Sequence, residues 1–315
     1  MKYPIDREFK KIAWFKTPLN RALLPFSTFL LRMVSAWLLI YWRRLKVKRQ
    51  RVKSPEWGNF TVLILSPKAE TKKLPCLVYL HGGGFVFDAS FCHYDLAARY
   101  ALKTPCKVVF VRYKLAPKHP YPYAPEQCLA SYLWARENAE KLNIDPDRIA
   151  IGGDSAGGTL TASVALMLRD RKLPLPCALM MIYPFFDGSL SSESIKKYTD
   201  TPMCNTPLLK KMLRFYLNGQ DIKDCPYASP IDCKDLHELP PSYIETAEFD
   251  CLHDDGAAFA KHLSEVTLHE THGTIHGYDA VLGGEIVTDS INRRLAFLKK
   301  HFNIEDSEDE NERMG

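Results

Sequence analysis

Short apolar runs and longer amphipathic stretches alternate along most of the chain after residue 54. The apolar runs have the length and composition of strands buried in a sheet. They span residues 60–65, 76–80, 107–111, 148–151, 177–183, 242–247 and 266–270. Helix-length segments separate several of them, as at residues 126–142 and 157–169. This alternation predicts an α/β fold with a mostly parallel central sheet and helices on both faces, in which ligands bind beyond the carboxyl ends of the strands.

The segment 23–42 is apolar almost throughout but contains Pro25 and Arg32. A segment of about 20 residues can span a bilayer, but a charge at its centre costs about 2.5 to 3.5 kcal/mol, so a full span is the least favoured interpretation. We favour helices packed on the rest of the protein. The alternative is an interfacial helix, with Trp37, Trp42 and the basic sequence after them resting on anionic lipid.

The formal net charge of +5 is unevenly distributed over the 315 residues. Between Phe9 and Pro55 there are twelve lysines and arginines and no acidic residue, so the remainder of the chain is net negative. Part of that negative excess lies in the stretch 305–313, for which we predict a solvated, disordered tail.

The composition is that of an ordered globular protein, since 46% of the residues are hydrophobic. Nine cysteines without a C-x-x-C pair favour reduced thiols over a disulfide framework or a zinc site. The first residues do not have the pattern of a secretory signal. We therefore expect a cytoplasmic protein, and peripheral contact of the basic N-terminus with the inner membrane face is a further hypothesis.

The sequence GGDSAGG follows the apolar run 148–151 and contains the pattern G-x-S-x-G. A strand that turns sharply into a helix brings the positions two before and two after the turn residue together, so Gly153 and Gly157 must both be glycine. The turn leaves Ser155 exposed at its tip. The amides beside Ser155 lie at a helix N-terminus, where negative charge is favoured, so we predict Ser155 as a nucleophile.

A second glycine-rich stretch, YLHGGGFVFD at residues 79–88, also follows an apolar run. Acyl transfer passes through a tetrahedral intermediate with a negative oxygen, which needs preorganised donors in a site with little water. Backbone N–H groups can serve only where the chain can approach closely, as glycine permits. We predict the amides of Gly83, Gly84 and Ala156 as these donors, and His81 as a residue that braces the loop.

A serine hydroxyl needs a histidine to accept its proton and a carboxylate to orient that histidine. His272 and His276 both follow the last apolar run, in the sequence HGTIHGYDAV. The sequence EFDCLHDDG, which follows the run before it, offers Asp250, Asp254 and Asp255. Spacing alone does not choose among these residues.

Together these motifs resemble the hormone-sensitive-lipase-like branch of the α/β-hydrolases, which includes many bacterial carboxylesterases. The matching stretches occur in the family's order between residues 79 and 278, and they are HGGGF, YKLAPKHPYP, GDSAGG, ASP, DCLHDDG and HGY. The resemblance implies an α/β-hydrolase fold with a helical cap, with Asp250 as the acid and His276 as the base.

The resemblance also implies a division of the chain. Residues 1–53 would form N-terminal cap helices, 54–187 and 224–303 the two parts of the hydrolase core, 188–223 a second cap segment and 304–315 the acidic tail. The chain departs from the family at Lys114 and Lys118, where Arg and Glu are usual, and at Cys251 and His253, where Pro and Arg are usual. These departures affect supporting contacts and leave the predicted nucleophile, acid and base in place.

The resemblance implies a serine carboxylesterase that acts on a small-molecule ester, with no cofactor and no nucleic-acid partner. We expect a preference for short, acetyl-like acyl groups, because bulky Phe87 follows the oxyanion glycines, and we assign Phe85, Asp154 and Phe185 to the same pocket. An amidase or deacetylase would use the same triad. A silent binding protein is disfavoured because His276 is present, and a zinc site because HETHGTIH lacks the spacing H-E-x-x-H.

Overall fold

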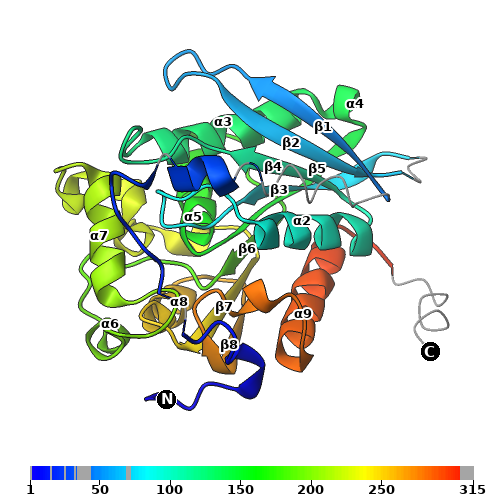
Figure 1. Ribbon diagram of the computed structural model, residues 1–315. Coiled ribbons are helices and arrows are strands. Elements are labelled where there is room, and N and C mark those ends of the chain that lie inside the picture. The colour runs from blue at the N-terminus through cyan, green and yellow to red at the C-terminus, as the bar shows by residue number, and fades with distance from the viewer. Residues whose placement is uncertain are drawn as a thin grey trace.

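The computed structural model describes residues 2–14, 16–24, 26–31, 33, 44–68 and 72–305. Its centre is an eight-stranded sheet with the strand order β1-β2-β4-β3-β5-β6-β7-β8 (Figure 1). The strands are β1 (Leu45–Val52), β2 (Phe60–Pro67), β3 (Leu74–Leu80), β4 (Lys107–Arg112), β5 (Ile144–Asp154), β6 (Leu179–Ile182), β7 (Ser242–Phe249) and β8 (Val266–Ile275). Strand β2 is antiparallel to β1 and β4, and the other neighbours are parallel. The predicted mostly parallel sheet is confirmed.

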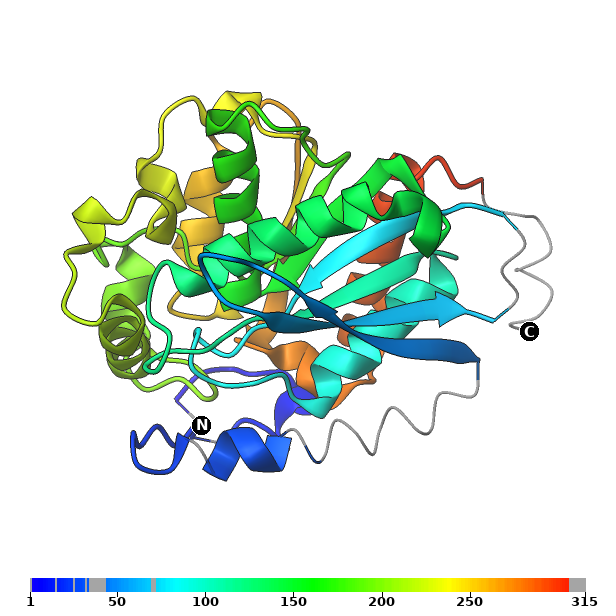
Figure 2. The same ribbon diagram turned by 90° about the horizontal axis from the view of Figure 1, so that it is seen from above.

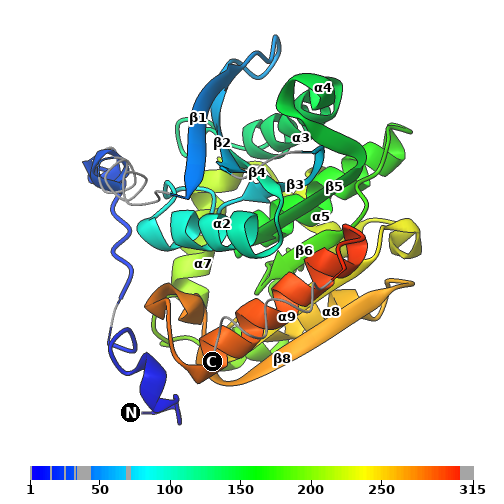
Figure 3. The same ribbon diagram turned by 90° about the vertical axis from the view of Figure 1, so that its right-hand side faces the viewer.

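Helices cover both faces of the sheet. Helices α2 (Phe91–Lys103) and α9 (Glu285–His301) lie on one face, and α3 (Tyr123–Glu137), α5 (Ala156–Asp170) and α8 (His253–Ala260) on the other (Figures 1 and 3). The shorter helices are α4 (Ala139–Leu142), α6 (Glu193–Lys197) and α7 (Thr206–Leu217). Single 3₁₀ turns are η1 (Arg7–Phe9), η2 (Ile222–Asp224), η3 (Pro226–Ala228), η4 (Pro230–Asp232), η5 (Leu236–Glu238) and η6 (Tyr278–Val281).

Each of the seven apolar runs found in the sequence corresponds to one strand, from β2 to β8. The central strands lie between two helical layers, so their side chains are buried on both faces, and β3 is buried at every position. This is why these strands show continuous apolar runs rather than alternation.

Strand β1 corrects the prediction that residues 1–53 form cap helices. Residues 45–52 pair antiparallel with β2 at the edge of the main sheet. Only the first and last residues of β1, Leu45 and Val52, are buried, and the lysines and arginines between them are exposed. Basic side chains on an edge strand disfavour its pairing with other chains. Because they also interrupt any apolar run, an analysis based on apolar runs does not detect this strand.

The N-terminal residues lie against the segment between β6 and β7 that contains α6 and α7, at one side of the molecule (Figures 1 and 2). Thr17 Oγ1 donates a hydrogen bond to the Met203 carbonyl (2.7 Å), and Lys211 Nζ donates to the Leu19 carbonyl. Most of the second half of the apolar segment 23–42, from residue 34 on, lies outside the described residues, as does the predicted tail from residue 306 on. Within the described part of the chain, no helix is long and apolar enough to cross a membrane.

Candidate active site

Ser155 lies at the turn between β5 and α5, in a strained conformation with φ 53° and ψ −122°. Its neighbouring glycines are required by close packing. A β-carbon on Gly153 would lie 2.6 Å from the Gly157 backbone, and one on Gly157 would overlap the Leu80 carbonyl. The turn therefore has the geometry that the G-x-S-x-G pattern predicts, with the serine hydroxyl at the tip.

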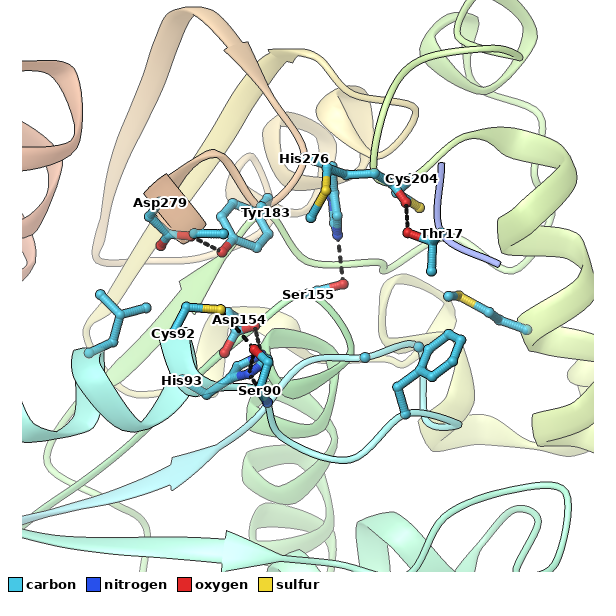
Figure 4. Close-up of a pocket in the computed structure, with 18 residues that line it drawn as sticks. Thr17, Ser90, Cys92, His93, Asp154, Ser155, Tyr183, Cys204, His276 and Asp279 are labelled. Carbon is cyan, nitrogen blue, oxygen red and sulfur yellow. Dashed lines mark hydrogen bonds and ion pairs between the residues drawn. The ribbon is translucent and has the colours of Figure 1, made fainter. Parts of the chain in front are cut away.

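The structure brings Ser155 together with His276 and Asp250 from the ends of three strands. His276 Nε2 lies 2.8 Å from Ser155 Oγ (Figure 4), and His276 Nδ1 lies 2.6 Å from Asp250 Oδ2. Asp250 directly follows β7 and is fully buried, and His276 directly follows β8. The second Asp250 oxygen accepts the Leu252 amide (3.0 Å), which fixes the carboxylate. This arrangement allows proton transfer from the serine hydroxyl to the imidazole.

The charge on Asp250 dominates the titration of His276. Burial alone lowers the pKa of an imidazole, because it disfavours the charged form. The nearby Asp250 carboxylate and its hydrogen bond outweigh that effect and raise the pKa of His276 to about 9. The pair therefore stabilises the imidazolium that forms when His276 accepts a proton.

The loop after β3 presents the two glycines that we predicted as oxyanion donors. Gly83 and Gly84 have φ of 107° and 58°, in the left-handed region that favours glycine. Among the described residues, no hydrogen bond outside the helices and strands has the amide of Gly83, Gly84 or Ala156 as its donor. All three amides are thus available to a ligand, and both loop glycines line the same cavity as Ser155.

His81 is part of the support of this loop. The side chain is fully buried, and its ring stacks on Tyr113 with the centroids 4.3 Å apart. Burial lowers the pKa of His81 to about 4, so the imidazole stays neutral. The Tyr113 hydroxyl donates to the His81 carbonyl (2.7 Å), which anchors the backbone just before the glycines.

The other candidate acids and base lie elsewhere. Asp254 Oδ2 accepts the Ser194 amide (2.8 Å), and Asp255 Oδ2 accepts the amide of Phe186 (3.0 Å). The His272 side chain is 87% exposed and its closest ionic partner is Glu248, at 3.8 Å. The structure thus distinguishes between candidates that sequence spacing left open.

One network beside the nucleophile was not predicted. Asp154, the residue before Ser155, accepts hydrogen bonds from the Tyr79 hydroxyl (2.6 Å) and from His93 Nε2 (3.0 Å) (Figure 4). The Ser90 amide donates to His93 Nδ1 (2.9 Å), so the ring proton of His93 lies on Nε2. Burial opposes ionisation of Asp154, but its contact with His93 and both hydrogen bonds hold the pKa of Asp154 below its usual range. No local sequence pattern marks His93, at the start of α2, as a partner of Asp154.

A second network supports His276. The ring of Tyr183 packs edge-on against His276, with the centroids 4.8 Å apart, and its hydroxyl donates to Asp279 Oδ1 (2.7 Å) (Figure 4). Arg294 Nη1 donates to Asp279 Oδ2 (2.8 Å), and Arg294 also pairs with Glu245. The position of Tyr183, as the last residue of the apolar run 177–183, was the one signal in the sequence that could have identified it.

The cavity above Ser155 has a volume of about 160 Å³. Of the four residues assigned to the acyl pocket, Asp154 and Phe87 line this cavity. Phe85 and Phe185 do not, which corrects their assignment. The Phe85 ring stacks on Tyr216 (centroids 3.9 Å apart), and Phe185 is buried in the core.

Several sulfur-containing residues and a threonine complete the wall of this cavity. They are Thr17, Cys92, Met203, Cys204 and Met212. Within the described residues, no group of three histidine, cysteine, aspartate or glutamate side chains is placed to hold a metal ion.

The fold and this site define a hydrolase of the α/β-hydrolase class. The family model of the α/β-hydrolase fold matches residues 77–280. The carboxylesterase NlhH of Mycobacterium tuberculosis is 34% identical over 264 residues, covering 81% of this chain and 83% of that protein. The ethyl acetate hydrolase of Pseudomonas putida is 32% identical over 217 residues, with 68% of each chain covered.

Among solved structures, a bacterial heroin esterase superposes with a TM-score of 0.87 and 27% identity, covering 95% of this chain and 98% of that one. The chain belongs to the α/β-hydrolase fold family, in its hormone-sensitive-lipase-like branch, and is a carboxylic ester hydrolase.

Proposed function

We propose that the protein hydrolyses esters of short acyl groups through a covalent acyl-enzyme formed on Ser155. The observation that carries this proposal is the hydrogen-bonded series Ser155, His276 and Asp250. Ser155 Oγ attacks the ester carbonyl carbon while its proton passes to His276 Nε2. The developing oxyanion accepts hydrogen bonds from the amides of Gly83, Gly84 and Ala156.

The intermediate then collapses and the alcohol leaves, taking the proton from His276 Nε2. A water molecule attacks the acyl-enzyme, with His276 again accepting a proton, and the carboxylic acid is released from Ser155. The Asp250 carboxylate holds the imidazole with its Nδ1 proton toward it.

The small size of the cavity supports a short acyl group. Pockets that hold drug-sized ligands are about 300 to 1,000 Å³, whereas this cavity has about 160 Å³. Phe87 occupies one wall of it, and Thr17, Met203 and Met212, which we assign to the cap, occupy another. The relative named ethyl acetate hydrolase acts, by its name, on an ester of a two-carbon acid.

The test is a series of kcat/KM measurements on p-nitrophenyl esters from acetate to palmitate. We expect a maximum between about two and six acyl carbons, because each methylene that fits adds about 0.8 kcal/mol of burial until the cavity is full. Ser155→Ala should lower the rate roughly 10⁴-fold or more, whereas His272→Ala should retain it. A maximum at twelve carbons or beyond would refute the short-acyl proposal, and cleavage of anilides without cleavage of esters would indicate an amidase.

A further inference from the structure

The N-terminal helix exposes most of its apolar side chains to solvent. The described residues between 24 and 33 are helical, and of these Leu24 is buried against the protein. The outer face of this helix, with the turn residue just before it, presents five side chains that are 52–66% exposed, namely Leu23, Phe26, Phe29, Leu30 and Met33. A surface helix normally turns its apolar stripe toward the core. Here the inner face carries Leu24 and the half-buried Ser27, Thr28 and Leu31, whereas most of the apolar side chains point outward.

Most of this outer apolar face stands clear of the body of the protein, and Phe29 at its margin also lines a cavity beneath the helix. In Figure 3 the blue helix lies at the margin of the molecule, beyond β1 and α2. Large contiguous apolar patches on a protein surface mark sites of interaction with proteins or membranes. The outer apolar face therefore indicates a binding partner, and the nearby basic side chains indicate the charge of that partner.

Basic residues precede this helix in the sequence. Arg21 is exposed three residues before the helix, Lys10, Lys11 and Lys16 are exposed earlier in the N-terminal segment, and the sequence contains no acidic residue between Phe9 and Pro55.

Further basic side chains lie between the helix and the body of the protein. A cavity of about 560 Å³ separates the helix from the loop that precedes α3. The described residues that line it include three positively charged side chains and no carboxylate, and the charged ones are Arg21, Lys114 and Lys118.

This charge argues against a second copy of the chain as the occupant. A two-fold symmetric interface places the same patch on both partners, so it would bring two sets of these basic side chains together. Like charges that face each other across an interface disfavour association. An anionic lipid surface has the opposite charge and accepts an apolar helix face among its acyl chains.

We propose that the outer apolar face docks on the surface of an anionic phospholipid bilayer, with the basic side chains around it facing the lipid headgroups. The helix lies in the plane of the interface and does not span the bilayer. Thr17, in the same N-terminal segment, lines the cavity above Ser155. Docking therefore brings the segment that contributes Thr17 to the active-site wall close to the membrane surface.

The experiment is co-sedimentation of the full chain with vesicles of phosphatidylcholine alone and of phosphatidylcholine with phosphatidylglycerol. We expect the protein to sediment with the anionic vesicles and to stay in the supernatant with the zwitterionic ones. Phe26→Gln with Leu30→Gln should abolish sedimentation. The matched control is Leu175→Gln with Leu268→Gln, which changes two apolar side chains that are each 37% exposed elsewhere on the surface. That control should bind as the unchanged chain does.

Replacing basic side chains gives a second, independent test of the proposal. Each lysine or arginine near an anionic surface contributes roughly a fivefold factor in the partition coefficient, so Arg21→Gln and Lys118→Gln should each weaken binding by about that factor. Hydrolysis of p-nitrophenyl acetate in solution should be unchanged in all of these variants, which shows that they fold. Because binding is measured without turnover, its result does not depend on the proposed acyl preference.

Three results would overturn the proposal. The first is no sedimentation of the unchanged chain with anionic vesicles, and the second is equal sedimentation with both vesicle types. The third is a dimer in solution, measured by light scattering without lipid, that Phe26→Gln with Leu30→Gln converts to a monomer. That result would show that a second copy covers the outer apolar face.

Discussion

Replacing Asp250 by asparagine should change both the rate of ester hydrolysis and its pH dependence. The Asp250 carboxylate is fully buried and lies 2.6 Å from His276 Nδ1. An asparagine at this position would keep the size of the side chain but remove its negative charge. Burial, which favours the neutral ring, would then be opposed only by the remaining interactions with Cys204 and Asp154, so the pKa of His276 would fall.

The magnitude follows from the titration of His276. Its pKa is about 9 in the protein, compared with an ordinary value of 6.5, which corresponds to about 3 kcal/mol of additional stabilisation of the imidazolium. His276 must be neutral to accept the serine proton, so kcat/KM should increase with pH until this group has lost its proton. We expect the midpoint of that increase above pH 6.5 in the unchanged enzyme. In Asp250→Asn the midpoint should fall well below that of the unchanged enzyme, and the maximal rate should fall about 10⁴-fold because the imidazole loses its orienting partner.

The assay is kcat/KM on p-nitrophenyl acetate from about pH 5 to about pH 9.5, a range that brackets the ordinary and the raised pKa of His276 and is corrected for alkaline hydrolysis with Ser155→Ala. Asp254→Asn serves as the control, because Asp254 binds the Ser194 amide rather than His276 and should keep the unchanged midpoint. A midpoint for Asp250→Asn that equals or exceeds that of the unchanged enzyme would refute the assignment of Asp250 as the group that raises the pKa of His276.

Three further predictions concern other parts of the structure. Gly157→Ala should abolish activity because the new β-carbon overlaps neighbouring backbone, whereas Gly283→Ala, which meets no atom within 4 Å, should be nearly neutral in the same esterase assay. Phe87→Ala should enlarge the cavity and increase kcat/KM for longer acyl chains by about fourfold per methylene that fits, which the ester series measures. Arg294→Met should lower the free energy of unfolding by about 3 to 5 kcal/mol in urea titrations, because Glu245 is left charged and fully buried, and Glu245→Gln should recover part of that loss.

The sequence predicted the interior of the sheet better than its edge. Strands β3 to β6 are covered by helices on both faces, so burial imposes continuous apolar runs that any hydrophobicity analysis detects. Strand β1 faces solvent along most of its length, and only Leu45 and Val52 at its ends are buried, so its sequence LKVKRQRV resembles a basic linker. Its partner β2 is the next strand along the chain, but the residues between the two ends of β1 contain no apolar run that marks them as a strand.

The same distinction applies to the active site. The turn at Ser155 and the glycine loop are local structures, and their backbone requirements restrict the residue types at fixed spacing. The contacts of Tyr183 with Asp279 and of His93 with Asp154 join residues 96 and 61 positions apart. Such contacts depend on how the strands are ordered in the sheet, so they became visible only in the folded chain.

The two acidic residues Asp250 and Asp255 show how environment rather than sequence assigns a chemical role. Both are buried, and they lie close together in the sequence. Asp255 accepts the backbone amides of Phe186 and Asp187, and its other oxygen has no hydrogen-bond partner among the described residues. Burial raises the pKa of Asp255 to about 7, so at neutral pH this carboxyl is only partly ionised. A carboxyl in that state provides little stabilisation to an imidazolium, whereas Asp250 faces His276 directly, and the two charges stabilise each other.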